Sequence, residues 1–242
     1  MTGGQLGTPR LHLRATGSTN DRARELAAAG APHGTLVTAA EQSAGRGRQG
    51  RRWSAPAGHA LLASVVLREP PELLPLAAAV AVADAVVATL PMQGAAVAIK
   101  WPNDVLLEGR KVAGILAEGR PQERWAVLGV GLNVAVGLAD LPAELLTTAA
   151  TMGLGAADVE MVLAELLAAL ERRLAQDPAA LLAAWESRDA LRGREVAWTT
   201  GRGVAAGIDG AGRLVVELPG GGRMALDAGE VHLRAGASRA RR

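Results

Sequence analysis

The sequence of 242 residues contains no cysteine, no phenylalanine and no tyrosine, and only two of its residues are lysines. Without cysteine, the chain can form no disulfide, use no thiolate nucleophile and bind no metal through sulfur. No apolar run reaches the roughly 18 residues that cross a membrane, and the N-terminus lacks the basic and apolar regions of a signal peptide. These absences favour a cytoplasmic protein without a membrane partner.

Histidine is also scarce, with only His12, His33, His59 and His232. No serine stands at a suggestive spacing from any of them, so neither a hydrolase triad nor a histidine metal site is expected. The strand expected at residues 11–14 leaves no room before it for a helix-turn-helix unit, and we therefore expect no DNA partner.

Positive charge is concentrated in two short segments. The net charge is only +2, although the pI is 9.9. Residues 43–53 hold four arginines and residues 234–242 hold another four, with no acidic residue in either segment. Removing these eight charges from the net +2 leaves −6 on the rest of the chain. Such concentration is typical of an anion-binding loop and a basic tail.

Apolar segments of strand length alternate with helical segments in the first 191 residues, which predicts an α/β (α+β) domain with a sheet and packed helices. A long loop is expected at residues 41–58, and a turn at Trp101-Pro102-Asn103-Asp104. We expect strands at residues 11–14, 34–40, 60–67, 95–99, 112–117 and 125–134. We expect helices from residue 18 to Gly30, from Pro70 to about residue 90, and at residues 158–174 and 178–191.

From residue 193 onward, short strands are separated by glycine-rich turns. These strands are expected at residues 195–199, 204–208, 214–218 and 223–226, and they predict a small β-barrel. The expected organisation is therefore a catalytic domain at residues 1–191, a barrel domain at residues 192–236 and a basic tail at residues 237–242.

The loop from Glu41 to Trp53 alternates glycine with arginine in Gly45-Arg46-Gly47-Arg48-Gln49-Gly50-Arg51. Glycine lets a backbone approach an anion closely, and guanidinium groups can hold a phosphate or a carboxylate in pairs. With little apolar content, the loop is expected to be mobile when empty and to close over a ligand. Taken alone, it fits equally well a solvated basic loop or an RNA-contacting patch with Trp53 as a stacking platform.

Both lysines lie in a second cluster, formed by Lys100-Trp101-Pro102-Asn103-Asp104 and by the segment from Lys111 to Glu118. In a chain that otherwise uses arginine, two neighbouring lysines indicate chemistry, because a compact ammonium suits an α-phosphate or a reacting carboxylate. Chance placement is the alternative. Asp104 is a candidate to hold magnesium or to polarise an incoming amine, or simply a carboxylate that caps a turn.

A third segment, Gly129-Val130-Gly131-Leu132-Asn133, places glycines in an apolar strand, where they often mark the close approach of a ligand. It lacks the third glycine and the opening helix of a dinucleotide-binding fingerprint.

Together, these segments resemble the biotin protein ligase family. Its signatures are a Gly-Arg-Gly-Arg-x-Gly-Arg-x-Trp loop, Lys-Trp-Pro-Asn-Asp, Lys-x-x-Gly-Ile-Leu-x-Glu and a Gly-x-Gly-x-Asn strand, and all four occur here in this order between Gln42 and Asn133. Ser18-Thr19-Asn20 also fits. The resemblance covers residues 11–234 and corresponds to the short form without an N-terminal DNA-binding domain. Because the chain has no Phe or Tyr, its aromatic contacts must come from tryptophan.

The resemblance implies a catalytic domain like those of class II aminoacyl-tRNA synthetases and biotin ligases, with a mixed sheet, flanking helices and a small C-terminal β-barrel. It also implies that biotin reacts with ATP to give biotinyl-5'-AMP, and that biotin then passes to a lysine of the biotin carboxyl carrier protein or domain of a biotin-dependent carboxylase. Magnesium is expected with ATP, with ligands that the sequence does not assign. Homodimers are common in that family, although the sequence reveals no interface.

The resemblance implies a role for each matching residue. The residues expected to be catalytic are Arg48, Asp104 and Lys111. Those expected to bind biotin are Ser18, Thr19, Asn20, Gln42, Arg46, Arg48, Lys111 and Gly114. Those expected to bind ATP or the adenylate are Arg46, Arg48, Arg51, Trp53, Asn103, Asp104, Lys111 and Asn133.

Two other functions stay open at this point. A lipoate or octanoate ligase of the same superfamily would instead resemble an Arg-Arg-x-x-Gly-Gly-Gly pattern, so the arginine-glycine loop favours biotin. A non-catalytic RNA-binding protein would use the basic loop and tail, and would show salt-dependent RNA affinity without exchange of ATP with pyrophosphate.

Overall fold

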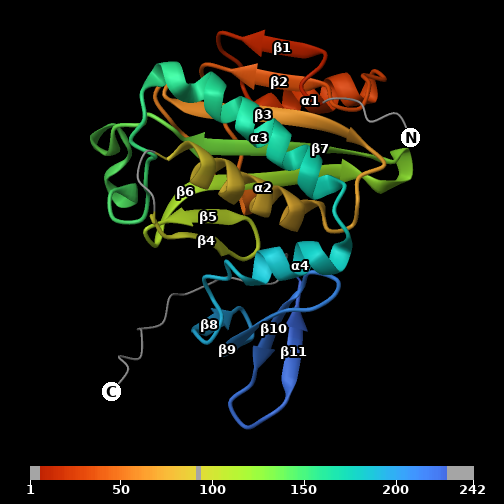
Figure 1. The fold of residues 1–242 in the computed structure, drawn as a ribbon, viewed down its shortest axis with the longest axis vertical. Coiled ribbons are helices and arrows are strands. Elements are labelled where there is room, and N and C mark those ends of the chain that lie inside the picture. Colours follow the sequence, from red (N-terminus) through yellow and green to blue (C-terminus); the bar gives the residue numbers. More distant parts are fainter. Residues whose placement is uncertain (1–5, 91–93, 228–242) are drawn as a thin grey trace.

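The computed structural model describes residues 6–90 and 94–227, most of which form a seven-stranded mixed sheet with flanking helices (Figure 1). Across the sheet, the strands are β1 (Arg10–Leu13), β2 (Leu36–Ala39), β3 (Ala60–Arg68), β7 (Trp125–Asn133), β6 (Arg110–Arg120), β5 (Asp104–Leu107) and β4 (Val97–Lys100). β1 and β2 pair in parallel, and the other neighbours pair antiparallel. The expected fold class is confirmed.

Helices cover both faces of this sheet. In β7, Val127 belongs to an apolar cluster with α1 (Thr19–Ala28), whereas the next residue, Leu128, belongs to a cluster with α2 (Leu74–Thr89) and α3 (Val159–Leu174). Because successive side chains of a strand point to opposite faces, α1 lies on one face and α2 with α3 on the other. The sequence of α2 is almost entirely Ala, Val and Leu, which suits its burial between the sheet and α3.

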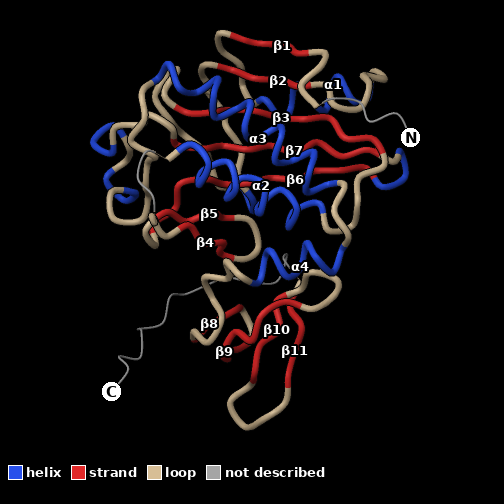
Figure 2. Tube along the Cα trace, in the orientation of Figure 1, coloured by secondary structure: helices blue, strands red, loops and turns tan. Residues whose placement is uncertain are grey.

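A second, four-stranded antiparallel sheet follows helix α4 (Pro178–Glu186) (Figure 2). Its strands, in spatial order, are β11 (Arg223–Leu226), β10 (Leu214–Glu217), β9 (Gly201–Ile208) and β8 (Glu195–Trp198). Four strands were expected in this part of the chain. Val196, Leu214 and Val216 join the main apolar cluster, so this sheet packs on the rest of the fold, where β9 contacts α4. The domain boundary after residue 191 stays a prediction, and residues 228–242, with the expected basic tail, lie outside the described residues.

Strand β5 was not expected, because its few apolar residues stand between two turn signals. It follows the Trp101-Pro102 turn and pairs with both β4 and β6. Glu108 and Gly109, with φ angles of 50° and 76°, form the tight turn from β5 into β6. The hairpin therefore continues the sheet where the sequence predicted only a turn.

Two helices are shorter than expected. The helix predicted from Pro70 begins at Leu74, with Pro75 in its first turn, where a missing N–H costs little. The helix predicted to reach residue 191 ends at Glu186, because the backbone beyond it pairs with β4. Ile99 N donates to Arg188 O at 2.7 Å, and Ala190 N donates to Ile99 O at 2.9 Å. Within residues 6–90 and 94–227, no helix has the length and apolar character needed to cross a membrane.

Candidate functional site

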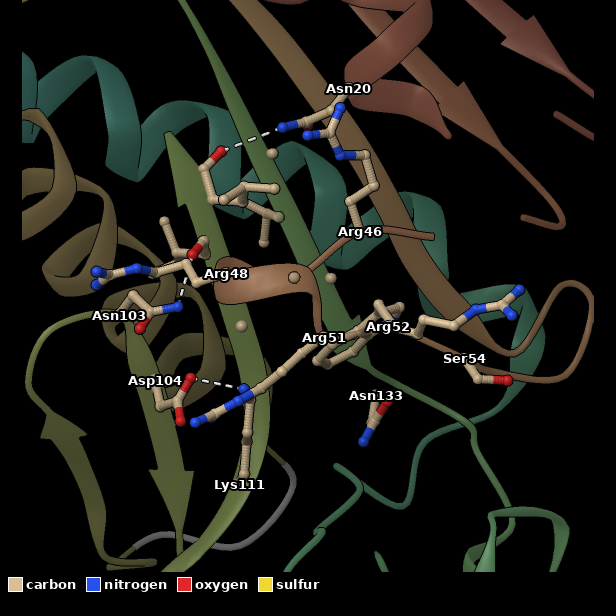
Figure 3. A pocket seen from close by; sticks show the side chains of 18 of the residues that line it. Asn20, Arg46, Arg48, Arg51, Arg52, Ser54, Asn103, Asp104, Lys111 and Asn133 are labelled. Carbon is tan, nitrogen blue, oxygen red and sulfur yellow. Dashed lines mark hydrogen bonds and ion pairs between the residues drawn. The ribbon is translucent and has the colours of Figure 1, made fainter. Parts of the chain in front are cut away.

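A cavity of about 330 Å³ opens between the long loop at residues 41–58, the start of α1, the turn between β4 and β5, and strands β6 and β7 (Figure 3). Every residue predicted for the site lines it. These residues are Ser18, Thr19, Asn20, Gln42, Arg46, Arg48, Arg51, Trp53, Asn103, Asp104, Lys111, Gly114 and Asn133. The structure therefore brings the separate motifs together, while the role of each residue stays a prediction.

One end of the cavity is a buried polar wall at the start of α1. Ser18 is the N-cap residue, with extended backbone, as the Ser-Thr-Asn-Asp sequence predicted. Ser18, Thr19 and Asn20 are all buried. The side-chain Oε1 of Gln42 accepts hydrogen bonds from the backbone N of Thr19 at 2.7 Å and from its hydroxyl at 3.0 Å. Ser18, Thr19 and Gln42 all line the cavity, so this wall is made of hydroxyl and amide side chains.

The arginine-glycine loop folds back on itself in a short hairpin-like turn. Gly47 N donates to Arg51 O at 2.7 Å, and Trp53 N donates to Gly45 O at 3.0 Å. A side chain at Gly45 would collide with the backbone of Trp53, which explains the glycine there. The arginine side chains of the loop point in different directions from this narrow backbone turn, as Figure 3 shows. The expected mobility of this loop stays a prediction.

The arginines of the loop have different surroundings. Arg46 donates to Asp21 at 2.6 Å and to Glu118 at 2.9 Å, and these contacts raise its pKa. Burial lowers the pKa of the Arg48 guanidinium, Asp104 acts in the opposite direction, and the nearby charge of Arg51 lowers it further. Arg48 is thus a partly desolvated cation in the wall of the cavity, where its attraction for an anion is stronger than in water.

Lys111 and Trp53 lie close to each other in the wall of the cavity. Lys111 Nζ lies 2.6 Å from Asp104 Oδ1 and 5.8 Å from the centroid of the Trp53 ring. A Cβ atom at Gly131 would lie 2.5 Å from the Trp53 ring, and one at Gly114 would lie 3.1 Å from it. The glycines of β6 and β7 therefore leave the space that the indole occupies, so that at Gly131 the close neighbour is a side chain of the protein and not a ligand.

Two buried polar atoms of this region have no hydrogen-bond partner among the described residues. They are Nε1 of Trp53, a donor, and Oδ1 of Asn133, an acceptor. Asn133 is otherwise fixed, because its Nδ2 donates to Ala150 O at 2.9 Å. Buried polar atoms are normally paired, so these two are candidates for bonding to a ligand.

Sequence reasoning missed residues on both sides of the cavity. Ser64 of β3 lies 2.8 Å from Thr19 Oγ1, and a lone serine in an apolar strand gives no sign of this contact. Glu118 was seen only as the last residue of a motif, without a role. No motif was assigned to residues 141–149, yet Leu141, Leu145, Thr148 and Ala149 line the cavity. Backbone hydrogen bonds from Lys111 N to Thr148 O and from Ala150 N to Lys111 O, both 2.7 Å, hold this segment beside β6.

The charge pattern suits a nucleotide with its own metal ion better than a metal site made by the protein. Within the described residues, no group of three or more His, Cys, Asp or Glu side chains could hold a metal ion. Among the described residues, Asp104 is the one carboxylate that lines the cavity, together with four arginines and both lysines of the chain. Magnesium in nucleotide sites often has only one or two carboxylate ligands, together with phosphate oxygens, so a single carboxylate is compatible with it.

Comparison with known proteins gives a consistent set of similarities. The family model described as the biotin/lipoate A/B protein ligase family matches residues 13–134. A biotin–[acetyl-CoA-carboxylase] ligase of Mycobacterium tuberculosis is 38% identical, over 90% of this chain and 87% of its own. One from Paracoccus denitrificans is 39% identical, over 90% of this chain and 98% of its own. A solved biotin protein ligase from Aquifex aeolicus, in complex with biotin and ATP, has a TM-score of 0.78 and 26% identity, covering 95% of this chain and all of its own.

Proposed function

The chain belongs to the biotin/lipoate A/B protein ligase family, and from this premise we propose that its cavity is where biotin is joined to AMP. Its relatives and structural neighbours are biotin protein ligases, and the chain acts accordingly as an ATP-dependent biotin ligase. One observation carries the assignment to this cavity. Arg48 and both lysines surround a space with a buried polar wall at one end and two unpartnered polar atoms, on Trp53 and Asn133, near the other.

The polar wall suits the ureido ring of biotin, which needs both donors and acceptors. Ser18 and Thr19 supply short polar groups that are already buried, and Gln42 is half-buried beside them, so little further desolvation is required. Arg46 borders the same end. Gly114 is proposed to contribute space, because a Cβ there would lie 3.2 Å from Lys111 Nζ. Asn20 is placed in the wall, with its amide already bonded inside the protein.

The chemistry is proposed to occur between Arg48 and Lys111. A carboxylate oxygen of biotin attacks the α-phosphorus of ATP, the new C–O–P linkage forms, and the bond to pyrophosphate breaks. Negative charge grows on the phosphate oxygens during this step, and cations that are already in place stabilise it. In the second step, the amine of a carrier lysine attacks the mixed anhydride, AMP leaves, and an amide forms. Asp104 is proposed to polarise that amine, and its 2.6 Å contact with Lys111 supports a role in holding this lysine in position.

The adenylate is proposed to lie along β7 and the loop. Trp53 offers a ring face and an unpartnered N–H, and Asn133 offers an unpartnered oxygen. Arg51 and Asn103 border the same space. Magnesium would be held by Asp104 together with the phosphates, and would neutralise charge on the leaving pyrophosphate.

The partner of the second step is proposed to be a biotin carboxyl carrier protein or domain of a biotin-dependent carboxylase, in keeping with the names of the relatives. The carrier must present its lysine to the open side of the cavity. The cytoplasmic location expected from the sequence stays a prediction, and so does the homodimer, which only the resemblance to a family suggests.

The test is exchange of labelled pyrophosphate into ATP, which reports adenylate formation alone. We expect exchange that depends on biotin and is not supported by lipoate or octanoate. Exchange with lipoate instead of biotin would move the assignment to a lipoate ligase, and salt-dependent RNA binding without exchange would favour the RNA-binding alternative.

The Arg48→Gly variant should release the adenylate faster, because the loop loses a partly buried cation. An unchanged adenylate half-life would contradict the role of Arg48.

A further inference from the structure

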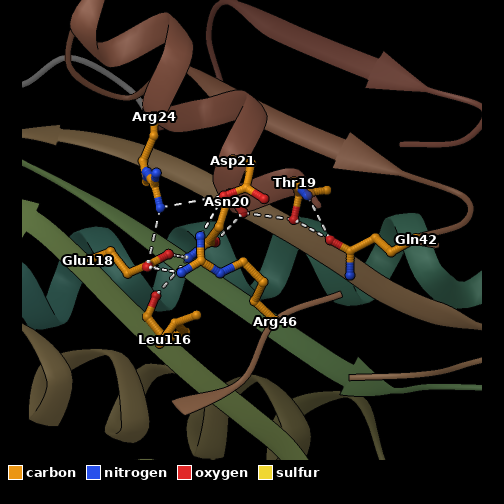
Figure 4. A network of polar contacts seen from close by, with 9 residues as sticks. Thr19, Asn20, Asp21, Arg24, Gln42, Arg46, Leu116 and Glu118 are labelled. Carbon is orange, nitrogen blue, oxygen red and sulfur yellow. Dashed lines mark hydrogen bonds and ion pairs between the residues drawn. The ribbon is translucent and has the colours of Figure 1, made fainter. Parts of the chain in front are cut away.

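Glu118 of β6 lies where two parts of the cavity wall meet (Figure 4). Its Oε2 accepts a hydrogen bond from Asn20 Nδ2 at 2.9 Å, and its Oε1 accepts one from Arg46 at 2.9 Å. Asn20 belongs to the buried wall at the start of α1, whereas Arg46 belongs to the arginine-glycine loop. A single carboxylate, only 22% exposed, therefore contacts the fixed wall and the loop at the same time.

On the side of the wall, the contact continues through a buried polar chain. The Ser64 hydroxyl donates to Asn20 Oδ1 at 2.6 Å and lies 2.8 Å from Thr19 Oγ1. Thr19 is bonded in turn to Gln42, at the start of the loop. Fully bonded polar chains in a protein interior are stiff, so a ligand that moves Thr19 or Gln42 also acts on Asn20. The chain links the polar end of the cavity to Glu118.

Asp21 provides a natural comparison for Glu118. Arg46 donates to Asp21 Oδ1 at 2.6 Å, which is shorter than its contact with Glu118. Arg24 lies 3.4 Å from Asp21 and 3.5 Å from Glu118, so two guanidinium groups and two carboxylates balance in charge. Within the part of the chain that the structure describes, Glu118 is bonded to the buried chain and Asp21 is not.

We propose that Glu118 is a positioning residue that couples occupancy of the polar end of the cavity to closure of the arginine-glycine loop, residues 43–53. The proposal rests on the proposed function for the identity of the ligand, biotin. When biotin fills the polar end, the chain from Thr19 to Asn20 becomes more rigid, and Glu118 is held in the position that binds Arg46. The closed state of the loop then becomes more populated. The size of this shift depends on how much more tightly the closed state binds biotin than the open state does.

The experiment measures trypsin cleavage at the arginines of the loop, with and without biotin, in the full chain. Glu118→Gln keeps an oxygen that can accept from Asn20, but it loses the charge that holds Arg46. Asp21→Asn also removes a charge from Arg46, without touching the buried chain. For the wild type and Asp21→Asn, we expect biotin to slow cleavage by about tenfold, a typical coupling between two sites, and for Glu118→Gln by less than about twofold.

A second measurement follows release of the adenylate from the isolated complex. Glu118→Gln should release it about tenfold faster than Asp21→Asn does, because a weaker coupling leaves the loop open more often. Arg124→Gln is the matched control, since it breaks a 2.9 Å surface ion pair with Glu69, away from the cavity. Cleavage at arginines outside the loop, followed in the same samples, detects a general loss of stability.

Equal loss of protection in Glu118→Gln and Asp21→Asn would overturn the proposal, because it would mean that the two carboxylates merely attract Arg46. Full protection in Glu118→Gln would overturn it as well. The proposal would also be overturned if biotin did not protect the loop of the wild type. Pyrophosphate exchange then distinguishes failure of the coupling from failure of the proposed function. If biotin-dependent exchange persists, only the coupling is wrong, and if exchange is also absent, the proposed function fails too.

Discussion

The ammonium group of Lys111 lies 2.6 Å from a carboxylate oxygen of Asp104, across the neighbouring strands β6 and β5. The hairpin from β5 to β6 thus orients one of the two lysines of the chain towards the middle of the cavity. A ligand carboxylate or phosphate would arrive beside a cation that is already positioned, so little reorganisation is needed at the moment of reaction.

Lys111→Gln should lower the rate of biotin-dependent pyrophosphate exchange by about 10²- to 10³-fold, the usual cost of removing one group that stabilises developing charge. The free energy of unfolding should fall by about 1–3 kcal/mol, because Asp104, whose side chain is 19% exposed, loses its charged partner. Urea unfolding measures this second quantity. A loss of less than about tenfold in exchange, in a normally folded variant, would remove Lys111 from the reaction.

Gly131→Ala tests the position of the Trp53 ring. A Cβ atom there would lie 2.5 Å from Cε2 of the indole, so the ring must shift. Since Trp53 is proposed to border the adenylate, we expect the KM for ATP in pyrophosphate exchange to rise by about tenfold, because small misplacements in a site are costly. Gly210→Ala is the control, because a Cβ at that position meets nothing within 4 Å. If both variants keep the wild-type KM, Trp53 does not position the nucleotide.

The motifs on both sides of the cavity were predictable because their chemistry is local. An anion site is indicated by the glycine and arginine of the loop and by two lysines in a chain that otherwise uses arginine. This indication does not depend on the fold. The N-cap at Ser18 and the apolar strands β3 and β7 likewise follow from short patterns in the sequence. Convergence of the motifs on one cavity needed the resemblance to a family, since spacing alone does not determine how strands pair.

Contacts between distant parts of the chain were not predictable. Ser64 meets Asn20 across 44 residues, and Glu118 meets Arg46 across 72 residues. Ser64 belongs to no motif and Glu118 only ends one, and neither signals its contact, because a lone serine in an apolar strand and a carboxylate on a strand are both common. Strand β5 was missed for a different reason, since four residues between two turns give too short a period to recognise.

A pH-dependent stability is expected from the ion pair between Arg10 of β1 and Glu160 of α3, whose closest approach is 2.6 Å. The hydrogen bond from Arg10 lowers the pKa of Glu160, and the charge of the same arginine adds to this effect against opposing burial. An acid with a lowered pKa in the folded state contributes stability above its ordinary pKa of 4.5. That contribution is lost as the pH falls through the lowered value.

Glu160→Gln should therefore reduce the free energy of unfolding at pH 7 by less than about 1 kcal/mol, because the Glu160 side chain is 62% exposed and solvent screens the pair. The difference from the wild type should shrink as the pH is lowered below 4.5. Urea unfolding at pH 7 and at acidic pH measures it. Glu165→Gln on the same helix is the control, since Glu165 has no ion pair among the described residues. A difference that grows on acidification would contradict the sign.

Trp101 connects the cavity to the second sheet. Its side chain is 2% exposed, and its Nε1 donates to Gly212 O at 3.0 Å, in the turn between β9 and β10. Trp101 also begins the turn that carries Asn103 and Asp104 into the cavity. The second sheet thus supports part of the cavity wall, although its own residues do not line it.

Trp101→Phe should destabilise the protein more than Trp185→Phe does. Both indoles are buried, but Nε1 of Trp185 has no partner among the described residues, so Trp185→Phe breaks no hydrogen bond. Trp101→Phe leaves Gly212 O without its donor, which should cost about 1–3 kcal/mol more in urea unfolding. It should also slow pyrophosphate exchange by about tenfold, because Asn103 and Asp104 lose their support. Equal stability losses, with exchange unaffected in both variants, would show that the second sheet does not hold this turn in place.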